Sequence, residues 1–566
     1  MPIRFPVRSF AAMALSLITS LPVLAEGQAG PYLAARHADF SGDFSAVVEY
    51  GTRALARDPG NIDIMEGLLI AQIGLGDFDM AIPVARRLQS LFPQSQVAGL
   101  VLLGDAMKRE DWDGVIQTLE KGTTVGELMD SMISAWAKLG QGQMSQALDI
   151  FQSLSDDPGS KMFVLFHQAL AYALVGDYEN AARILSGDEG PLQLNRRGVF
   201  TYVQVLSQSE RFDDAIDLLD KVYSGAQDPE IEALHRKLAA HEAIAFDAIS
   251  SPRDGMAEVF FTVGDSLAGE VEANVVLLYS RMAEYLIPGN VPAALLSASQ
   301  LEKLELFDLA VDAYGQIGPD DRAYPQAVLG RAEALRHWGK VDESIGELRA
   351  LARAYPDLAP IHVTLGDTLR FEKRYGEAAA AYDDAIALYE TPLPDQWSVY
   401  FSRAIAFERE GSWPAAEADF RKALELKPGQ PNVLNYLGYS YVEMQTNLDE
   451  ALDMIERAVA ARPGDGYITD SLGWVYYRTG RYDEAVEQME RAVELMPVDA
   501  IVNDHLGDVY WAVNRKREAE FQWRRALSFD PEEEEAVRIR RKLEIGLDAT
   551  LEEEGAAPLT RTDEDG

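Results

Sequence analysis

Hydrophobic and small residues recur along this chain with a period of about 34 residues. In the last third, prolines mark the period, with spacings of 35, 34 and 34 from Pro428 to Pro531. Between the prolines, a Leu-Gly pair is followed by a tyrosine and then by two alanines. The members are Leu437-Gly438, Leu472-Gly473 and Leu506-Gly507; Tyr441, Tyr476 and Tyr510; Ala451, Ala485 and Ala519; Ala458, Ala492 and Ala526. This period indicates stacked pairs of antiparallel helices, because neither helix can bury its apolar face alone.

The same register continues upstream in a more degenerate form. Taking the first alanine of each second helix as the marker, most steps are 34 and fourteen units are recognisable. The markers are Val47, Ala81, Val115, Ala147, Ala181, Ala215, Val276, Ala310, Ser344, Ala378, Ala416, Ala451, Ala485 and Ala519. Turns such as Gly76-Asp77-Phe78 separate the two helices, since glycine can adopt the left-handed conformation that ends the first one. The pattern predicts an all-α solenoid.

One long break in the rhythm divides the array. The step from Ala215 to Val276 is 61 residues and contains a predicted long helix, from about Glu230 to Ile249. Beyond Pro531, acidic residues start a further helix and basic residues follow, as the helix dipole favours. We therefore expect an N-terminal degenerate array at 26–228, an irregular helical linker at 229–256, a C-terminal array at 257–531, a capping helix at 532–548 and a disordered acidic tail at 549–566.

The first 25 residues have the order of a secretory signal peptide. Arg4 and Arg8 precede an apolar stretch from Phe10 to Leu21, and Val23-Leu24-Ala25 follows. An uncleaved anchor is the weaker alternative, because the apolar stretch is shorter than the ~20 residues that a spanning helix needs. We expect cleavage after Ala25 and a mature protein that is soluble outside the cytoplasm, with no direct membrane insertion.

Composition excludes several classes of function for these 566 residues. Lys and Arg total 51 against 92 Asp and Glu, a net charge of −41 that becomes −43 after cleavage. Such a charge argues against nucleic acid and against binding to an anionic membrane surface. The chain has no cysteine, so disulfides, thiolate metal sites, catalytic thiols and lipid attachment through cysteine are excluded.

No catalytic, cofactor or metal motif stands out. The chain lacks a phosphate-binding G-x-x-x-x-G-K-[ST] loop, an H-E-x-x-H pair and a G-x-S-x-G elbow. His235 and His241 form the one close histidine pair, and their spacing puts them on roughly opposite faces of a helix. We therefore expect no enzyme activity, no cofactor and no metal.

The L-G-x2-Y, alanine and proline positions resemble the tetratricopeptide repeat. The resemblance implies a right-handed superhelical solenoid of antiparallel helix pairs, whose first helices line a concave face that binds peptides. On that face it implies a protein-binding site, in which Asn can pair with a peptide backbone and Trp and Tyr can act as hot spots. An alternative is that Trp474 and Tyr477 pack between repeats. The site residues are Asn432, Asn435, Tyr439, Tyr467, Asp470, Trp474, Tyr477, Arg478, Asp504, Asp508 and Trp511.

The stretch from Leu434 to Leu527 is similar to one group of bacterial envelope tetratricopeptide proteins. The residues that carry this likeness are Leu434-Asn435-Tyr436-Leu437-Gly438-Tyr439, Asp470-Ser471-Leu472-Gly473-Trp474, His505-Leu506-Gly507-Asp508 and Trp523-Arg524-Arg525-Ala526-Leu527. The group includes an outer-membrane adaptor for a carboxy-terminal processing protease that degrades peptidoglycan hydrolases. The resemblance implies a periplasmic scaffold in a Gram-negative bacterium, although this chain lacks the lipid-bearing cysteine of that adaptor.

Three functions stay open at this point. The chain can be an adaptor that presents substrates to an envelope protease or cell-wall hydrolase. It can equally be a scaffold or chaperone for the assembly or export of an envelope complex. An unrecognised enzyme is the third option, and the missing catalytic motifs disfavour it.

Overall fold

The computed structural model describes residues 29–120, 125–190, 192–223 and 229–559, and it divides into two compact units, 1–338 and 339–566. The predicted signal peptide, 1–25, and the last residues of the predicted tail, 560–566, lie outside the described residues. In the described ranges the regular structure is helical, apart from one isolated bridge between Ala268 and Val271. None of the helices found there combines the length and apolar character needed to cross a bilayer.

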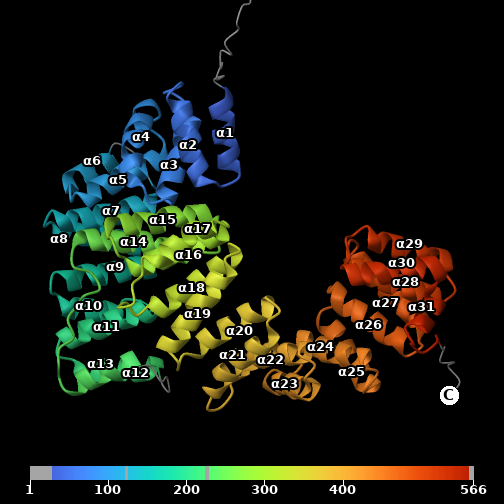
Figure 1. Ribbon diagram of the computed structural model, residues 1–566. Coiled ribbons are helices and arrows are strands. Elements are labelled where there is room, and N and C mark those ends of the chain that lie inside the picture. The colour runs from blue at the N-terminus through green and yellow to red at the C-terminus, as the bar shows by residue number, and fades with distance from the viewer. Residues whose placement is uncertain (1–28, 121–124, 191, 224–228, 560–566) are drawn as a thin grey trace, which may run out of the picture. The chain divides into compact units, whose positions relative to one another are not determined.

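Unit 1 contains helices α1 to α18, which follow one another as antiparallel pairs apart from α13 and α18 (Figure 1). Their bounds are α1 Ala29–Phe40, α2 Phe44–Leu55, α3 Ile62–Gly74, α4 Phe78–Leu91, α5 Gln96–Lys108, α6 Trp112–Glu120, α7 Glu127–Gly140, α8 Met144–Ser155, α9 Lys161–Leu174, α10 Tyr178–Leu185, α11 Arg196–Gln208, α12 Phe212–Tyr223, α13 Pro229–Ala239, α14 Pro252–Leu267, α15 Ala273–Leu286, α16 Val291–Lys303, α17 Phe307–Gly315 and α18 Tyr324–His337.

Unit 2 begins with α19 and continues through five further pairs to two terminal helices. Their bounds are α19 Val341–Ala354, α20 Ala359–Phe371, α21 Tyr375–Ala387, η1 Pro394–Gln396, α22 Trp397–Arg409, α23 Trp413–Leu426, α24 Pro431–Glu443, α25 Leu448–Ala461, α26 Gly466–Arg478, α27 Tyr482–Leu495, α28 Ala500–Ala512, α29 Lys516–Leu527, α30 Glu533–Ile545 and α31 Leu547–Glu553. The all-α fold of repeated helix pairs is confirmed.

The fourteen marker positions all fall in the second helix of a repeat. Each marker is at most 3% exposed, including Val47 and Ser344, where alanine is replaced. The glycines of the Leu-Gly pairs make room for a large side chain of the second helix. A Cβ at Gly473 would lie 2.7 Å from Cγ of Met489, and one at Gly507 would lie 2.4 Å from Cδ1 of Trp523. Each of these side chains comes four residues after the marker, on the same helix face.

The turn inside each repeat contains at least one residue with a left-handed backbone. Among the described residues, fourteen such turns have φ between 54° and 95°, and eight of them use glycine, as at Gly480. The other six place a side chain there, for example at Lys373 with φ 58°. The predicted Gly-aromatic turns are therefore one form of the left-handed turn that occurs in every repeat.

In unit 1, α14 and α15 pack across the first helices of the preceding pairs, α3, α5, α7 and α9 (Figure 1). Arg281 in α15 donates from Nε to the carbonyl oxygen of Gly74 at 3.1 Å, and the Tyr285 ring stacks on Phe78 at 4.2 Å. A Cβ at Gly104 would lie 2.6 Å from Sδ of Met282. This explains why Ala71–Gly74 of α3 is buried all round, since a helix covered on every face has no polar stripe. The first helices of these pairs are therefore covered by the chain's own helices.

The segment around the break in the rhythm also differs from expectation. α13 ends at Ala239, well before Ile249, because His241 adopts a left-handed backbone and an irregular stretch follows. Residues 229–256 lie inside unit 1, and α14 begins at Pro252. At the other end, residues up to Glu553 of the predicted tail are helical, because Gly546 turns the chain and α31 pairs with α30 through Arg538–Glu554 and Arg541–Glu553 bonds.

Candidate protein-binding face of the second unit

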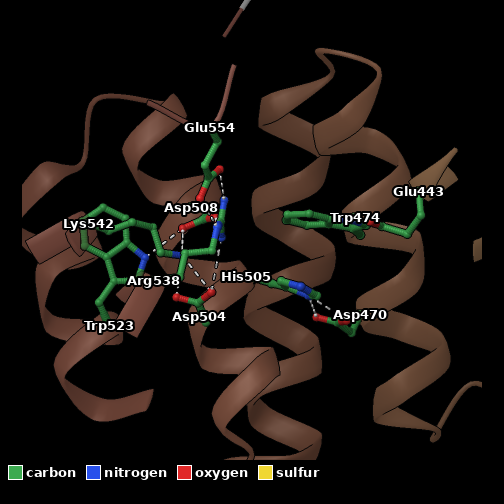
Figure 2. Close-up of polar contacts among 10 residues, drawn as sticks. All are labelled: Glu443, Asp470, Trp474, Asp504, His505, Asp508, Trp523, Arg538, Lys542 and Glu554. Atoms are coloured by element: carbon green, nitrogen blue, oxygen red, sulfur yellow. Dashed lines mark hydrogen bonds and ion pairs between the residues drawn. The ribbon is translucent and has the colours of Figure 1, made fainter. Parts of the chain in front are cut away.

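The predicted binding residues lie on the first helices of three consecutive pairs, α24, α26 and α28. Figure 2 shows four of them, Asp470, Trp474, Asp504 and Asp508, with the residues that they contact. The structure brings their central members together, but most of these side chains are turned into the protein. In α26 every residue from Ile468 to Val475 is buried, so the helix is enclosed on all sides. The centre of this face is therefore a buried layer of polar side chains between repeats. We call it the layer.

Trp474 is at the centre of this layer. Its indole stacks on His505 of the next repeat at 4.0 Å and on Tyr477 at 4.8 Å, and its Nε1 donates to Oε1 of Glu443 at 2.6 Å. Trp474 and Tyr477 are each 7% exposed. Of the two interpretations that the sequence allowed for these aromatics, packing between neighbouring repeats is the one that the structure shows.

Asp470 pairs with the same histidine. Nδ1 of His505 lies 3.0 Å from Oδ2 of Asp470. Burial lowers the pKa of His505, but the charge and hydrogen bond of Asp470, together with Asp504 and Asp508, outweigh it and raise the pKa above its ordinary value. The pair ties α26 to α28 most strongly when the imidazole is protonated.

Lys542 of α30 completes the layer on the other side of α28. Its side chain is fully buried, and Nζ donates to Oδ1 of Asp504 at 2.6 Å and to Oδ1 of Asp508 at 2.6 Å. Trp523 Nε1 donates to the same Asp508 oxygen at 2.9 Å. Nearby, Arg538 bonds Glu554 at 2.8 Å and lies 3.5 Å from Asp508 (Figure 2). Asp504 and Asp508, predicted to contact a partner, are thus neutralised by the chain's own capping helix.

The remaining predicted residues lie around the edge of the layer. Trp511 donates from Nε1 to Asp548 at 2.9 Å, and Arg478 lies 3.8 Å from Glu443. Tyr439 is half-buried, and burial together with Glu443 and Asp470 raises the pKa of its hydroxyl. These contacts hold α24, α26, α28 and the C-terminal helices together.

Two predicted residues, Asn432 and Tyr467, keep groups that a partner could reach, whereas Oδ1 of Asn435 is buried. Asn432 and Tyr467 are exposed, and each makes one side-chain hydrogen bond, from Arg462 to Asn432 and from Tyr467 to Asp499. Asn435 is half-buried, and its Oδ1 has no hydrogen-bond partner among the described residues. Partner binding by the whole predicted set stays a prediction.

Comparison with known families identifies the repeat. The family description "Tetratricopeptide repeat" matches residues 363–431 and again residues 429–497. Residues 363–497 are tetratricopeptide repeats. This stretch runs from α20 to the end of α27, and it includes the enclosed helix α26. Tetratricopeptide repeats form protein-binding scaffolds, so the chain has the fold of such a scaffold.

A curated relative carries the same repeat. A TPR repeat-containing protein of Pseudomonas aeruginosa is 29% identical over 173 residues, which is 30% of this chain and 28% of that protein. The match thus spans less than a third of the relative. Its similarity supports the tetratricopeptide assignment, and the likeness to the protease-adaptor group stays a prediction.

Solved structures with similar helix arrangements include three tetratricopeptide or related assemblies. The hetero-tetramer Cut9–Hcn1 of APC/C matches with 16% identity and a TM-score of 0.39, covering 93% of this chain and 97% of that one. A tetratricopeptide protein of Parabacteroides merdae matches with 15% identity and a TM-score of 0.38, covering 45% and 98%. YrrB, described as a TPR protein with an unusual peptide-binding site, matches with 20% identity and a TM-score of 0.28, covering 34% and 97%.

Sequence reasoning missed His505, Arg538 and Lys542 as members of the layer. The tetratricopeptide period contained the signal, because Arg538 follows Asp504 by 34 residues and Lys542 follows Asp508 by 34 residues. Equivalent positions of successive first helices face one another, so an acid and a base one period apart meet. As for metals, no three histidine, aspartate or glutamate side chains converge as a metal site would require within the described ranges.

Proposed function

We propose that this protein is a non-enzymatic scaffold of the periplasm that binds a protein partner and presents substrates to an envelope protease or peptidoglycan enzyme. The tetratricopeptide repeats at 363–497 carry the proposal, since such repeats bind proteins or peptides. The signal-like order of Arg4, Arg8 and the apolar stretch that follows supports the compartment. The likeness of residues 434–527 to envelope adaptors supports the class of partner.

Assembly or export of an envelope complex is the second candidate. A long array of helix pairs offers many contact sites along one chain, which suits a protein that holds several subunits at once. The two candidates differ in their partners. Identification of the bound protein therefore separates them.

The test of this function uses Asn432 and Asn435, because Asn432 is exposed and Asn435 is half-buried. Trp474→Ala and Tyr477→Ala are poor probes, since both rings are buried between repeats and their loss would destabilise unit 2. Affinity capture is carried out from a periplasmic extract with the mature chain and with the N432A/N435A variant. Glu487→Ala, at an exposed position on the second helix α27, is the matched control.

We expect a protease or peptidoglycan hydrolase to be retained by the wild type and by Glu487→Ala and to be lost from N432A/N435A. Recovery of assembly or export subunits in the same pattern would favour the second candidate. Identical captured proteins from all three baits would remove Asn432 and Asn435 from the binding face. Fractionation that finds the chain only in the cytoplasm would contradict the proposed compartment.

A further inference from the structure

Unit 2 exposes a cluster of apolar side chains at the turn between α27 and α28. Val498 is 69% exposed, Ile501 45%, Leu495 39% and Tyr467 59%. Soluble proteins expose single apolar residues routinely, whereas several together mark an interaction site or a ligand groove. We call these four residues the turn patch.

Leu495, Val498 and Ile501 are close in the sequence, and Tyr467 lies beside this turn in space. The hydroxyl of Tyr467, at the start of α26, donates to Oδ2 of Asp499 at 3.2 Å. A Cβ at Gly466 would lie 3.2 Å from Cβ of Leu495. The patch therefore runs from the end of α27 through the turn to the first residues of α28 and crosses to α26.

The repeat itself shows that folding does not require these side chains. The helix α28 follows its N-cap residue Asp499 as α26 follows Asp465 and as α24 follows Gln430. In this alignment the position of Val498 is glycine in both earlier repeats, Gly464 and Gly429, and the position of Ile501 is Asn432 in α24. The turn before α26 forms with Gly464 at the first position, and the start of α24 forms with Asn432 at the second. Val498 and Ile501 thus add exposed apolar surface that the local structure does not use.

The charges around the turn patch and on the whole chain select the occupant. Asp465, Glu494 and Asp499 adjoin patch residues in the sequence. Three arginines lie near the turn and bond neutral acceptors, Arg462 the Asn432 side chain, Arg491 the Pro463 carbonyl and Arg525 the Pro497 carbonyl, so the charge of the whole chain decides. The chain carries a net charge of −41. A second copy would bring the same charge, and an anionic membrane surface would be repelled as well. A segment with apolar side chains next to lysine or arginine complements both properties.

We infer that the turn patch is a docking site for a basic amphipathic segment of a partner protein. Its apolar face covers Val498, Ile501, Leu495 and Tyr467, and its basic residues face the carboxylates around them. The inference rests on the proposed scaffold function and adds a surface that lies at the edge of the repeats, apart from the enclosed layer around Trp474. It also names the chemistry of the bound segment.

The test measures binding of labelled peptides to the full chain by fluorescence anisotropy. The probes are an amphipathic peptide of leucine and lysine, the same peptide with serine for leucine, and one with glutamate for lysine. The variant is V498G/I501N, which installs the residues that the chain itself uses at the equivalent positions. Phe521→Glu is the control, because Phe521 is a 63% exposed apolar residue of α29 whose equivalent one repeat earlier is Glu487.

We expect the leucine–lysine peptide to bind V498G/I501N at least about tenfold more weakly than the wild type and Phe521→Glu, because the variant loses apolar contact area at unchanged charge. The two altered peptides should bind weakly to all three proteins. A second variant, Tyr467→Asn, should weaken binding in the same direction, and circular dichroism checks the fold of each.

Equal binding of the leucine–lysine peptide to V498G/I501N and the wild type would overturn the inference. A dimer of the wild type that V498G/I501N abolishes, seen by analytical ultracentrifugation, would overturn it too and assign the patch to self-association. Two results together would reject only this site and support the scaffold function. They are loss of partner capture by N432A/N435A and peptide binding that V498G/I501N does not change. Peptide binding that V498G/I501N weakens, with no periplasmic partner captured, would support this site and contradict the proposed scaffold function.

Discussion

Gly255 of α14 lies directly against the indole of Trp136 in α7. A Cβ at position 255 would stand 2.5 Å from Cδ2 of that ring, and the ring is fully buried. Trp136 precedes the break in the repeat and Gly255 lies within it. Their contact is part of the surface on which α14 covers the first helices of the preceding pairs. The absence of a side chain at 255 is what allows the two helices to approach.

Gly255→Ala tests this packing. We expect the substitution to destabilise unit 1 by about 1–3 kcal/mol, because the buried indole must move to make room for the methyl group. Hydrogen exchange followed by mass spectrometry should show faster exchange in α7 and α14. Gly60→Ala, where a Cβ meets nothing within 4 Å, should leave exchange in both helices unchanged. Unchanged exchange in Gly255→Ala would mean that α14 does not pack on Trp136.

Acid should weaken unit 1 through His167. Its two ring nitrogens have no hydrogen-bond partner among the described residues, and burial, with the charge of Arg197, lowers its pKa to about 3. The unfolded histidine binds a proton below about pH 6.5 while the folded one stays neutral, so stability is lost as pH falls from about 6.5 toward 3. Between pH 7 and pH 5 this contribution amounts to about 2 kcal/mol.

Comparison with His167→Leu isolates this contribution from that of the buried carboxylates. We expect the free energy of unfolding of unit 1, measured in urea at pH 7 and pH 5, to fall more for the wild type than for the variant. At pH 7 the variant should be of similar stability, since leucine leaves no unpaired polar atom in the core. The same pH dependence in both proteins would show that His167 reaches solvent or a bonded water.

Removal of the buried amine in α30 should be costly for unit 2. Lys542→Met leaves Asp504 and Asp508 without the bonds from Nζ, and burial already raises the pKa of the Asp504 carboxyl. Breaking a buried ion pair from one side typically costs about 3–5 kcal/mol. Denaturant unfolding should show a loss of this order, and the triple variant D504N/D508N/K542M should recover part of it. A loss below about 1 kcal/mol would place Lys542 in contact with solvent.

The left-handed turn residues give a stabilising variant. Lys373 has φ 58° and is exposed, so its side chain pays the steric penalty of this conformation without a compensating role in the core. We expect Lys373→Gly to stabilise unit 2 by about 0.5–1 kcal/mol, after the extra chain entropy of glycine is counted. Gly480→Ala, at φ 78°, should destabilise by about 1 kcal/mol. Urea midpoints that move in the opposite directions would contradict this.

The helix pairs could be predicted because every unit repeats the same local packing. A marker such as Val115 is recognisable by its distance from its neighbours even where alanine is replaced, since the second helix must approach the first closely at that point. The placement of α14 and α15 could not be predicted in this way. The contacts of Gly255 with Trp136 and of Met282 with Gly104 join residues far apart in sequence and follow no period.

The candidate site was predicted only in part, because some of its contacts follow the repeat and others do not. The resemblance placed Trp474, Asp504 and Asp508 on one face, and the structure brings them together there. Their burial depends on what comes one period later, where Lys542 supplies the charge that two clustered carboxylates require. Exposed residues such as Val498 carry no periodic signal, because glycine occupies the same position in neighbouring repeats.

Site-specific photocrosslinking in living cells tests the central claim most directly, namely that unit 2 binds a protein partner at its exposed surface. A photoreactive residue is placed at Val498 in the full chain, and at Glu487 as the control on the exposed side of α27. We expect a discrete adduct from position 498 that contains an envelope protein with a basic amphipathic segment, and none from position 487. Equal adducts from both positions, or an adduct of the chain with itself at 498, would contradict it.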